Sequence, residues 1–201
     1  TVIRQELENL AKEFERADGY QPITTPELAH EHLYERSGHV PYYQEDMYNA
    51  IDIEGQNYRL RPMNCPHHHM MYLHQLWSYR QLPVRFSEYG KVFRYEPSGT
   101  LTGLMRTRSF CQNDAHIYCR PVQAKDLFLE VMRLHARYYD LFGIKEYYMH
   151  LSLPDMDNLE KYVDRPEQWR KAVEIIQAAM QESGLPYEEV PGEAAFYGPK
   201  V

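Results

Sequence analysis

The chain has 201 residues, 43% of them hydrophobic, and a formal net charge of -7 at pH 7. Such a chain can build one sizeable core, and it shows neither an apolar run long enough to span a membrane nor a secretory leader, so we expect one domain and no membrane association. Because the net charge is negative, any contact with nucleic acid must use a local basic patch and not a global positive field.

The first half of the chain predicts three helices. Apolar residues recur at helical spacing from Ile3 to Phe14, and Gly19 closes that helix. Residues 27–38 predict a second helix. A third is predicted over 64–79, because its opening Asn-Cys-Pro places proline in the first helical turn, where proline is tolerated.

The second half predicts two further helices, with apolar stripes over 127–141 and 169–180 that are ended by Gly143 and Gly184. Predicted strands occupy 57–62, 86–96, 106–119, 146–153 and 195–201. This order favours an α+β fold in which helices flank a mixed but mainly antiparallel sheet.

The most informative pattern lies between Leu104 and His116, where every second residue carries a functional group or a ring. These residues are Arg106, Arg108, Phe110, Gln112, Asp114 and His116. Because a strand sends successive side chains to opposite faces, all six would share one face. A solvated strand face also alternates polar residues and is the commoner outcome for such a pattern, so the preceding segment decides between the two interpretations.

Residues 86–96 are rich in aromatic and β-branched residues and are followed by the turn formers 97–99 and Gly103, which predicts a hairpin with a flexible loop. Arg94 and Glu96 would join the even-numbered face if the two strands pair with like parity, a register that the sequence leaves open. Arginine matches phosphate oxygens with a planar fork. The combination indicates a polyphosphate held by arginines, a purine against an aromatic ring and a small polar substrate beside a carboxylate.

The string Arg94-Tyr-Glu-Pro-Ser-Gly, together with Arg106, Phe110 and Gln112-Asn-Asp-Ala-His116, resembles motif 2 of class II aminoacyl-tRNA synthetases in the form that threonyl-tRNA synthetases carry. Three other segments resemble further parts of the same enzymes. Arg61-Pro-Met-Asn-Cys-Pro-His67 is similar to the segment that contains a zinc-binding cysteine. Residues 19–26 are similar to the end of motif 1, and residues 192–200 are similar to the strand ahead of motif 3. The resemblance covers essentially the whole chain.

The resemblance implies that residues 1–201 are a class II catalytic core that stops before motif 3 and includes no editing or anticodon-binding domain. It also implies a homodimer formed through the first helix and the strand near Pro26. The implied reaction is attack of the L-threonine carboxylate on the α-phosphate of ATP, followed by transfer of threonine from threonyl-adenylate to the acceptor end of tRNA(Thr).

The resemblance also assigns the ATP-binding residues. Arg94 is expected at the α-phosphate and the substrate carboxylate, and Arg106 at the γ-phosphate of a bent ATP. Glu96 would accept a hydrogen bond from the adenine amino group, Phe110 would stack on the ring, and Lys200 would add positive charge near the reacting phosphate. Mg²⁺ is expected to accompany ATP. Catalysis would then consist mainly of positioning and charge stabilisation by Arg94, Arg106 and Lys200.

For threonine, the resemblance implies that Gln112 and Tyr197 hold the amino group, Asp114 engages the hydroxyl group, and Met63 packs against the substrate. Threonine and valine are near isosteres, so an apolar pocket separates them poorly. A site that binds the hydroxyl leaves buried polar groups unpaired when valine enters, and therefore discriminates far better.

The residues alone do not indicate a zinc site, because Cys65 and His116 lie far apart in sequence and no compact ligand signature links them. A helix N-terminus favours the thiolate of Cys65, yet a small buried hydrophobe and a structural histidine are the commoner outcome for two unlinked residues. The resemblance implies that both bind Zn²⁺ with a further histidine downstream of this chain. The histidines at 67–69 are expected to be helix residues, since consecutive helical side chains cannot all face one ion.

Two other interpretations remain. One is a synthetase-like module, or an inactive excised fragment, that binds a nucleotide or amino acid without catalysis. The other is a prolyl or seryl enzyme, which the cysteine and histidine pair disfavours. The chain has three cysteines, Cys65, Cys111 and Cys119, which contain no CxxC pair and are not the even number typical of a disulfide framework. This pattern favours a reducing compartment, and we expect the cytoplasm.

Overall fold

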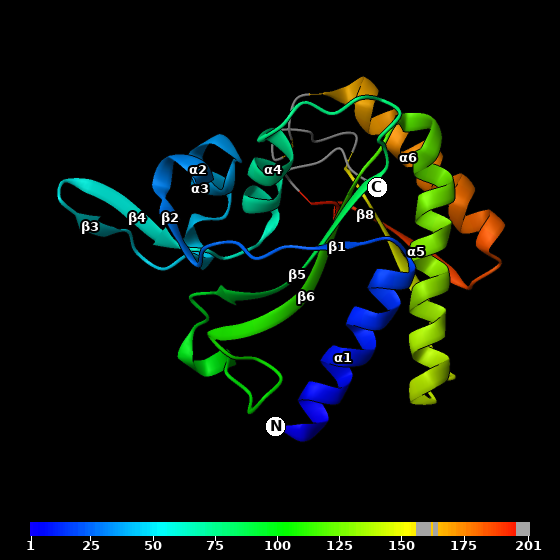
Figure 1. Cartoon of the computed structure of the whole chain (residues 1–201), viewed down its shortest axis with the longest axis horizontal. Coiled ribbons are helices and arrows are strands. Elements are labelled where there is room, and N and C mark those ends of the chain that lie inside the picture. The colour runs from blue at the N-terminus through cyan, green and yellow to red at the C-terminus, as the bar shows by residue number, and fades with distance from the viewer. Residues whose placement is uncertain (156–161, 163–164, 196–201) are drawn as a thin grey trace. The chain divides into compact units, whose positions relative to one another are not determined.

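A computed structural model of the chain describes residues 1–155, 162 and 165–195. The chain divides into two compact units, Thr1–Tyr118 and Cys119–Val201. Each unit combines helices with strands (Figure 1). Among the described residues, no helix is both long enough and apolar enough to cross a bilayer.

The first unit holds a long hairpin, a second small sheet and several helices. In chain order its elements are α1 (Val2–Ala17), β1 (Gln21–Pro22), β2 (Leu28–His30), α2 (Glu31–Arg36), α3 (His39–Tyr42), η1 (Gln44–Asp46), β3 (Ile51–Ile53), β4 (Gln56–Leu60), α4 (Cys65–Leu73), β5 (Val84–Phe93), η2 (Ser98–Thr100) and β6 (Ser109–Tyr118). Strands β2, β4 and β3 form the small antiparallel sheet in that order.

The hairpin of β5 and β6 is antiparallel, and its register runs from Val84 opposite Tyr118 to Phe93 opposite Ser109. Glu88 therefore faces Asp114, and even-numbered residues pair with even-numbered residues throughout. The like-parity register that the sequence left open is thus the one observed. Because directly opposed side chains lie on the same face of a sheet, both strands contribute to one even-numbered face.

Different helices cover the two faces of the hairpin. On the odd-numbered face, the Lys12 ammonium of α1 lies 5.0 Å from the ring centroid of Tyr89, and Figure 1 shows α1 running beside the hairpin. On the even-numbered face, Tyr72 of α4 stacks on Tyr118 of β6 with ring centroids 4.0 Å apart. The end of the even-numbered face that carries Asp114 and His116 therefore lies beside α4.

The prediction of a helix over 27–38 is wrong at its start, where Leu28–His30 form β2 and pair with β4. The helix begins only at Glu31, because the side chain of His30 accepts a hydrogen bond from the backbone N–H of His32 and caps it. A strand partner in β4, distant in sequence, overrides the local helical pattern.

Several predicted boundaries also need correction. The helix predicted over 64–79 ends at Leu73, after which Trp77 folds back, stacks on Tyr72 and donates to its carbonyl oxygen at 2.7 Å. The strand predicted over 106–119 begins at Ser109, because Arg106 instead forms an isolated bridge with Thr102 inside the loop.

Three more strand predictions have outcomes of different kinds. The strand predicted over 57–62 spans 56–60, and the one over 146–153 begins at 149. The strand predicted over 195–201 lies outside the described residues except for Ala195, which is not in a strand.

The second unit consists of α5 (Pro121–Phe142), β7 (Met149–Leu153), α6 (Pro166–Ser183) and β8 (Tyr187–Pro191). Both predicted helices are present, and each is followed by a glycine in the left-handed conformation. β7 and β8 pair in parallel. The sequence did not predict β8, since two consecutive glutamates weaken its strand signal.

Candidate functional site

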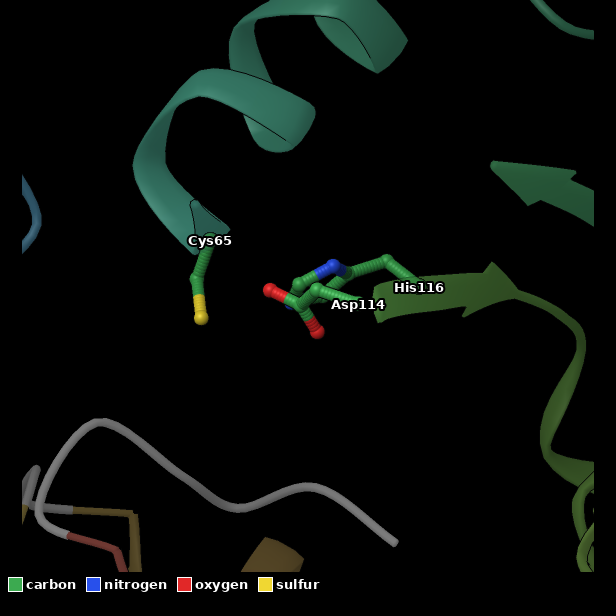
Figure 2. Close-up of side chains that lie close together, drawn as sticks. All are labelled: Cys65, Asp114 and His116. Atoms are coloured by element: carbon green, nitrogen blue, oxygen red, sulfur yellow. The ribbon is translucent and has the colours of Figure 1, made fainter. Parts of the chain in front are cut away.

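Cys65, Asp114 and His116 come together where the first residue of α4 approaches β6. The ligand atoms of these three side chains all lie within 4.8 Å of one another. Figure 2 shows the Cys65 side chain extending from the start of α4 into the space beside Asp114 and His116. Cys65 is buried, and the other two are half-buried. Two predicted metal ligands and one predicted threonine-binding residue thus share a cluster, although the sequence separates them widely.

Asn64 holds the carboxylate of Asp114 in place. Its Nδ2 donates to Asp114 Oδ2 at 3.1 Å, and the asparagine is completely buried. Its Oδ1 lacks a hydrogen-bond partner among the described residues. Gly90, opposite Gln112 in the hairpin, leaves the necessary room, because a Cβ at this position would collide with the Asn64 amide. An unmatched buried acceptor is a group that a bound ligand can satisfy.

Behind His116 lies a buried network of charged and polar groups. His116 Nδ1 is 2.9 Å from His68 Nδ1, and His68 Nε2 is 3.0 Å from Glu88 Oε2. The Glu88 carboxylate also accepts hydrogen bonds from the backbone N–H of Thr25 at 2.9 Å, from its hydroxyl at 2.7 Å and from Arg61 Nη1 at 3.1 Å. Every hydrogen-bonding side chain in this network except His116 is buried.

Glu88 stays ionised in spite of its burial. Desolvation by burial would raise its pKa, but the hydrogen bonds from His68 and Thr25, together with the charge of Arg61, outweigh it and lower the pKa to about 2. A buried carboxylate with this many donors is therefore an anion at neutral pH.

The three consecutive histidines of α4 have different hydrogen-bonding partners. His67 Nε2 lies 3.1 Å from the Tyr34 hydroxyl, and burial lowers the pKa of His67 to about 4, so it is neutral at pH 7. His68 belongs to the network behind His116, and His69 Nδ1 lies 2.8 Å from the Tyr118 hydroxyl. They are residues of α4, and the Cys65 cluster contains none of them.

The predicted nucleotide-binding residues associate in two pairs. The Arg94 guanidinium lies 5.1 Å from the ring centroid of Phe110, and its Nε donates to the Pro62 carbonyl at 3.3 Å. In the hairpin loop, Arg106 Nε donates to Glu96 Oε2 at 2.9 Å. A cavity of about 590 Å³ is lined by Tyr95 and by residues between 41 and 59, and none of the predicted site residues that the structure describes lines it.

The remaining candidates differ in how the structure places them. Gln112 and Met63 are half-buried, with Gln112 on the even-numbered face of β6. Arg108 supports the loop, since it donates to the Glu96 carbonyl at 2.9 Å and to the Ser98 hydroxyl at 3.1 Å. Tyr197 and Lys200 lie outside the described residues.

Sequence reasoning missed Asn64, His68 and Glu88 as parts of the site. Two signals could have found them. His68 follows Cys65 by three residues, so both lie on one face of a helix. Glu88 has the same parity as Asp114, so the like-parity register places the two carboxylates opposite each other.

Residues 48–201 match the family described as the tRNA synthetase class II core domain (G, H, P, S and T). Because this match covers most of the chain, the chain belongs to the class II aminoacyl-tRNA synthetase core family. The class II fold expected from the sequence is confirmed.

Within that class, the predicted resemblance to threonyl-tRNA synthetases is also confirmed. The threonine–tRNA ligase of Oceanobacillus iheyensis is 46% identical over 200 residues, which cover 100% of this chain and 31% of that protein. A putative threonyl-tRNA synthetase from Aeropyrum pernix superposes with a TM-score of 0.86 at 33% identity, over 96% of this chain and 44% of that one.

The RNA binding domain of threonyl-tRNA synthetase from Cryptosporidium parvum superposes with a TM-score of 0.85 at 32% identity, over 96% of this chain and 46% of that one. The chain thus spans about a third of the length of the curated relative and less than half of each of these solved structures.

Proposed function

We propose that this chain is the catalytic part of a threonine–tRNA ligase. It would activate L-threonine with ATP and transfer the threonyl group to the acceptor end of tRNA(Thr). The observation that carries the proposal is the even-numbered face of β6. Phe110, beside Arg94, lies at one end of this face, and Asp114 and His116, beside Cys65, lie toward the other. The face from 110 to 116 is about 20 Å long, enough for a nucleotide and an amino acid joined end to end.

At the nucleotide end, the adenine ring would stack on Phe110, and Arg94 beside it would meet the α-phosphate and the threonine carboxylate. Arg106 and Glu96 form an ion pair at 2.9 Å. ATP would separate this pair, so that Arg106 turns to the γ-phosphate and Glu96 to the adenine amino group. Lys200 would add positive charge at the reacting phosphate, and Mg²⁺ would enter with ATP.

At the amino-acid end, Asp114 would accept a hydrogen bond from the threonine hydroxyl group, while Gln112 and Tyr197 hold the amino group and Met63 packs against the substrate. The bond from Asn64 orients the Asp114 carboxylate before substrate arrives. Valine would desolvate this carboxylate without supplying the hydrogen bond that the threonine hydroxyl group donates, which is why a hydroxyl-binding site rejects it.

The residues around Asp114 also fit a Zn²⁺ ion. A thiolate and an imidazole are the ligand types that zinc prefers, and those of Cys65 and His116 lie within 4.8 Å of each other and of the Asp114 carboxylate. We propose that Cys65 and His116 hold the ion, with Asp114 beside it. Bound zinc would supply a Lewis acid for the amino and hydroxyl groups of threonine.

The proposal extends to partners and compartment. Val2, Ile3 and Leu7 of α1 are exposed, and such apolar residues on the first helix support a homodimer formed through it. Leu104 and Met105 are exposed in the loop that precedes β6, where they would be accessible to the tRNA acceptor end. A thiol that must bind metal suits the reducing cytoplasm.

The test is threonine-dependent exchange of pyrophosphate into ATP, with Zn²⁺ and Mg²⁺ supplied and with serine, valine and proline as competing amino acids. We expect exchange with threonine, weaker exchange with serine and almost none with valine or proline. Calorimetric titration of threonine should show binding that Asp114→Ala and Cys65→Ser abolish.

The matched control is Cys111→Ser, a cysteine on the odd-numbered face of the same strand, which should leave threonine binding unchanged. Threonine binding without exchange would favour the non-catalytic module. Unchanged threonine binding in Asp114→Ala would contradict the assignment of the pocket.

A further inference from the structure

His68 is a buried residue in contact with the proposed metal ligand His116, and the proposed reaction does not use it. Its side chain is completely buried, and its two ring nitrogens have different partners, His116 Nδ1 at 2.9 Å and Glu88 Oε2 at 3.0 Å. The two imidazole rings meet edge to face, with centroids 4.7 Å apart. His68 therefore lies between a buried carboxylate and a candidate metal ligand.

The partners of Glu88 determine which atom of His68 carries a proton. The carboxylate already accepts hydrogen bonds from Thr25 and Arg61, and a carboxylate with these donors is an acceptor only. His68 Nε2 must therefore be the donor in its contact with Glu88. The charges of Arg61 and Glu88 already balance, so a second buried cation at His68 would be costly.

In neutral His68, the proton on Nε2 leaves Nδ1 as a hydrogen-bond acceptor. The contact of 2.9 Å between His68 Nδ1 and His116 Nδ1 then requires His116 Nδ1 to be the donor. A neutral His116 with its proton on Nδ1 has an unprotonated Nε2. A metal can bind an imidazole only through such an unprotonated nitrogen.

We propose that Glu88 and His68 form a hydrogen-bond relay that fixes His116 as its Nδ1-protonated tautomer, so that Nε2 is the nitrogen that binds zinc. His68 is a positioning residue that acts through His116. It lies three residues after Cys65 in α4, so one face of this helix supplies both a ligand and the group that orients the other ligand. The proposal depends on the proposed function only for the identity of the metal.

The tautomer can be measured without metal, by long-range ¹H–¹⁵N correlation spectra of the chain labelled at histidine nitrogen. We expect His116 to be protonated on Nδ1 and His68 on Nε2. A wild-type His116 protonated on Nε2 would overturn the relay, and this measurement needs no variant that could fail to fold.

Variants test whether His68 is responsible. In His68→Phe the acceptor for His116 Nδ1 is lost, so His116 should populate the Nε2-protonated tautomer and the affinity for Zn²⁺, measured by competition with a chromophoric chelator, should fall roughly 10- to 100-fold. His68→Gln, whose amide oxygen can accept from His116, should restore part of both. The amide spectra of the same samples report whether each variant is folded.

The matched control is His69→Phe, which alters the neighbouring ring, 5.4 Å from that of His116, without altering the Nδ1 contact. It should change neither the tautomer nor the affinity. An unchanged tautomer in folded His68→Phe would overturn the relay. If His116 and His68 show the expected tautomers but the chain does not bind Zn²⁺, the relay is supported and zinc is removed from the proposed function. Failure of the relay and failure of the proposed function are therefore distinguishable.

Discussion

The described parts of this chain's two units differ in how many charged and polar side chains they bury. In the first, charged and polar side chains are buried together, among them Arg61, His68 and Glu88, each no more than 3% exposed. In the second, the buried cluster is apolar and is formed around Met132, Leu151 and Met180.

The difference shows what each kind of interior provides. An apolar core gains stability from non-directional burial and adapts to substitution, whereas a buried network of charges holds its members in one geometry and is costly when any partner is lost. The candidate site lies beside the polar interior, where Asn64 holds the Asp114 carboxylate and His68 contacts the His116 imidazole.

The largest effect is expected for Arg61→Met, which leaves the Glu88 carboxylate buried without its cationic partner. The free energy of unfolding should fall by about 4 kcal/mol, in the range for breaking one side of a buried ion pair. The two tryptophans allow the units to be followed separately, since Trp77 lies in the first and Trp169 in the second. Urea unfolding monitored by Trp77 in a Trp169→Phe background measures this loss, and a loss below about 1 kcal/mol would contradict the role given to the network.

A somewhat smaller loss is expected for Leu151→Ala in the apolar core of the second unit. Removing this buried side chain, 3% exposed, should cost about 3 kcal/mol through lost burial and the cavity left behind. The measurement is urea unfolding monitored by Trp169 in a Trp77→Phe background. The surface variant Val122→Ala, at a residue that is 79% exposed, is the control and should have almost no effect.

Acid should affect the polar interior through Glu88. Its pKa is lowered from 4.5 to about 2 in the folded chain, so the unfolded chain binds the proton more tightly. The stability that this carboxylate contributes is complete above about pH 4.5 and is lost as the pH falls toward 2, by up to about 3 kcal/mol.

Glu88→Gln tests this dependence, because glutamine has no titrating carboxyl group. We expect the slope of stability between pH 5 and pH 3, measured by urea unfolding monitored by Trp77, to be flatter in this variant than in the wild type. Glu174→Gln, at an exposed position of α6, should keep the wild-type slope. Equal slopes in all three proteins would show that Glu88 does not titrate as described.

Gly90→Ala should weaken the site more than the fold. The new Cβ would collide with the Asn64 amide, so the bond from Asn64 to Asp114 must shift. Threonine affinity, measured by calorimetry, should fall about tenfold, or about 1.4 kcal/mol. Gly99→Ala has open space around its Cβ and should bind threonine normally, and a Gly90→Ala variant that does the same would remove Asn64 from the pocket.

The smallest effect is expected for Gly143→Ala at the end of α5. This glycine has φ of +69°, and no atom lies within 4 Å of a Cβ built on it, so the change adds backbone strain without a clash. The expected loss is about 1 kcal/mol, measured by thermal or urea unfolding with Trp169 as the reporter. A gain in stability would show that the backbone relaxes out of the left-handed region.

Local patterns determined a substantial part of this protein. The helical spacing from Ile3 to Phe14 and the closing glycines Gly143 and Gly184 correctly placed α1, α5 and α6, since these signals act within a few turns of chain. The alternation from Phe110 to His116 likewise predicted correctly that these even-numbered side chains share one face of a strand, because side-chain period is a local property of an extended backbone.

Only the tertiary structure decided which distant residues meet. It determined the register that sets Glu88 opposite Asp114, the approach of Cys65 to His116, and the contact of His68 with both Glu88 and His116. It also turned residues 28–30 into a strand by supplying β4 as a partner. These outcomes depend on strand pairing and packing between segments far apart in the chain, and no local pattern of side chains specifies that pairing.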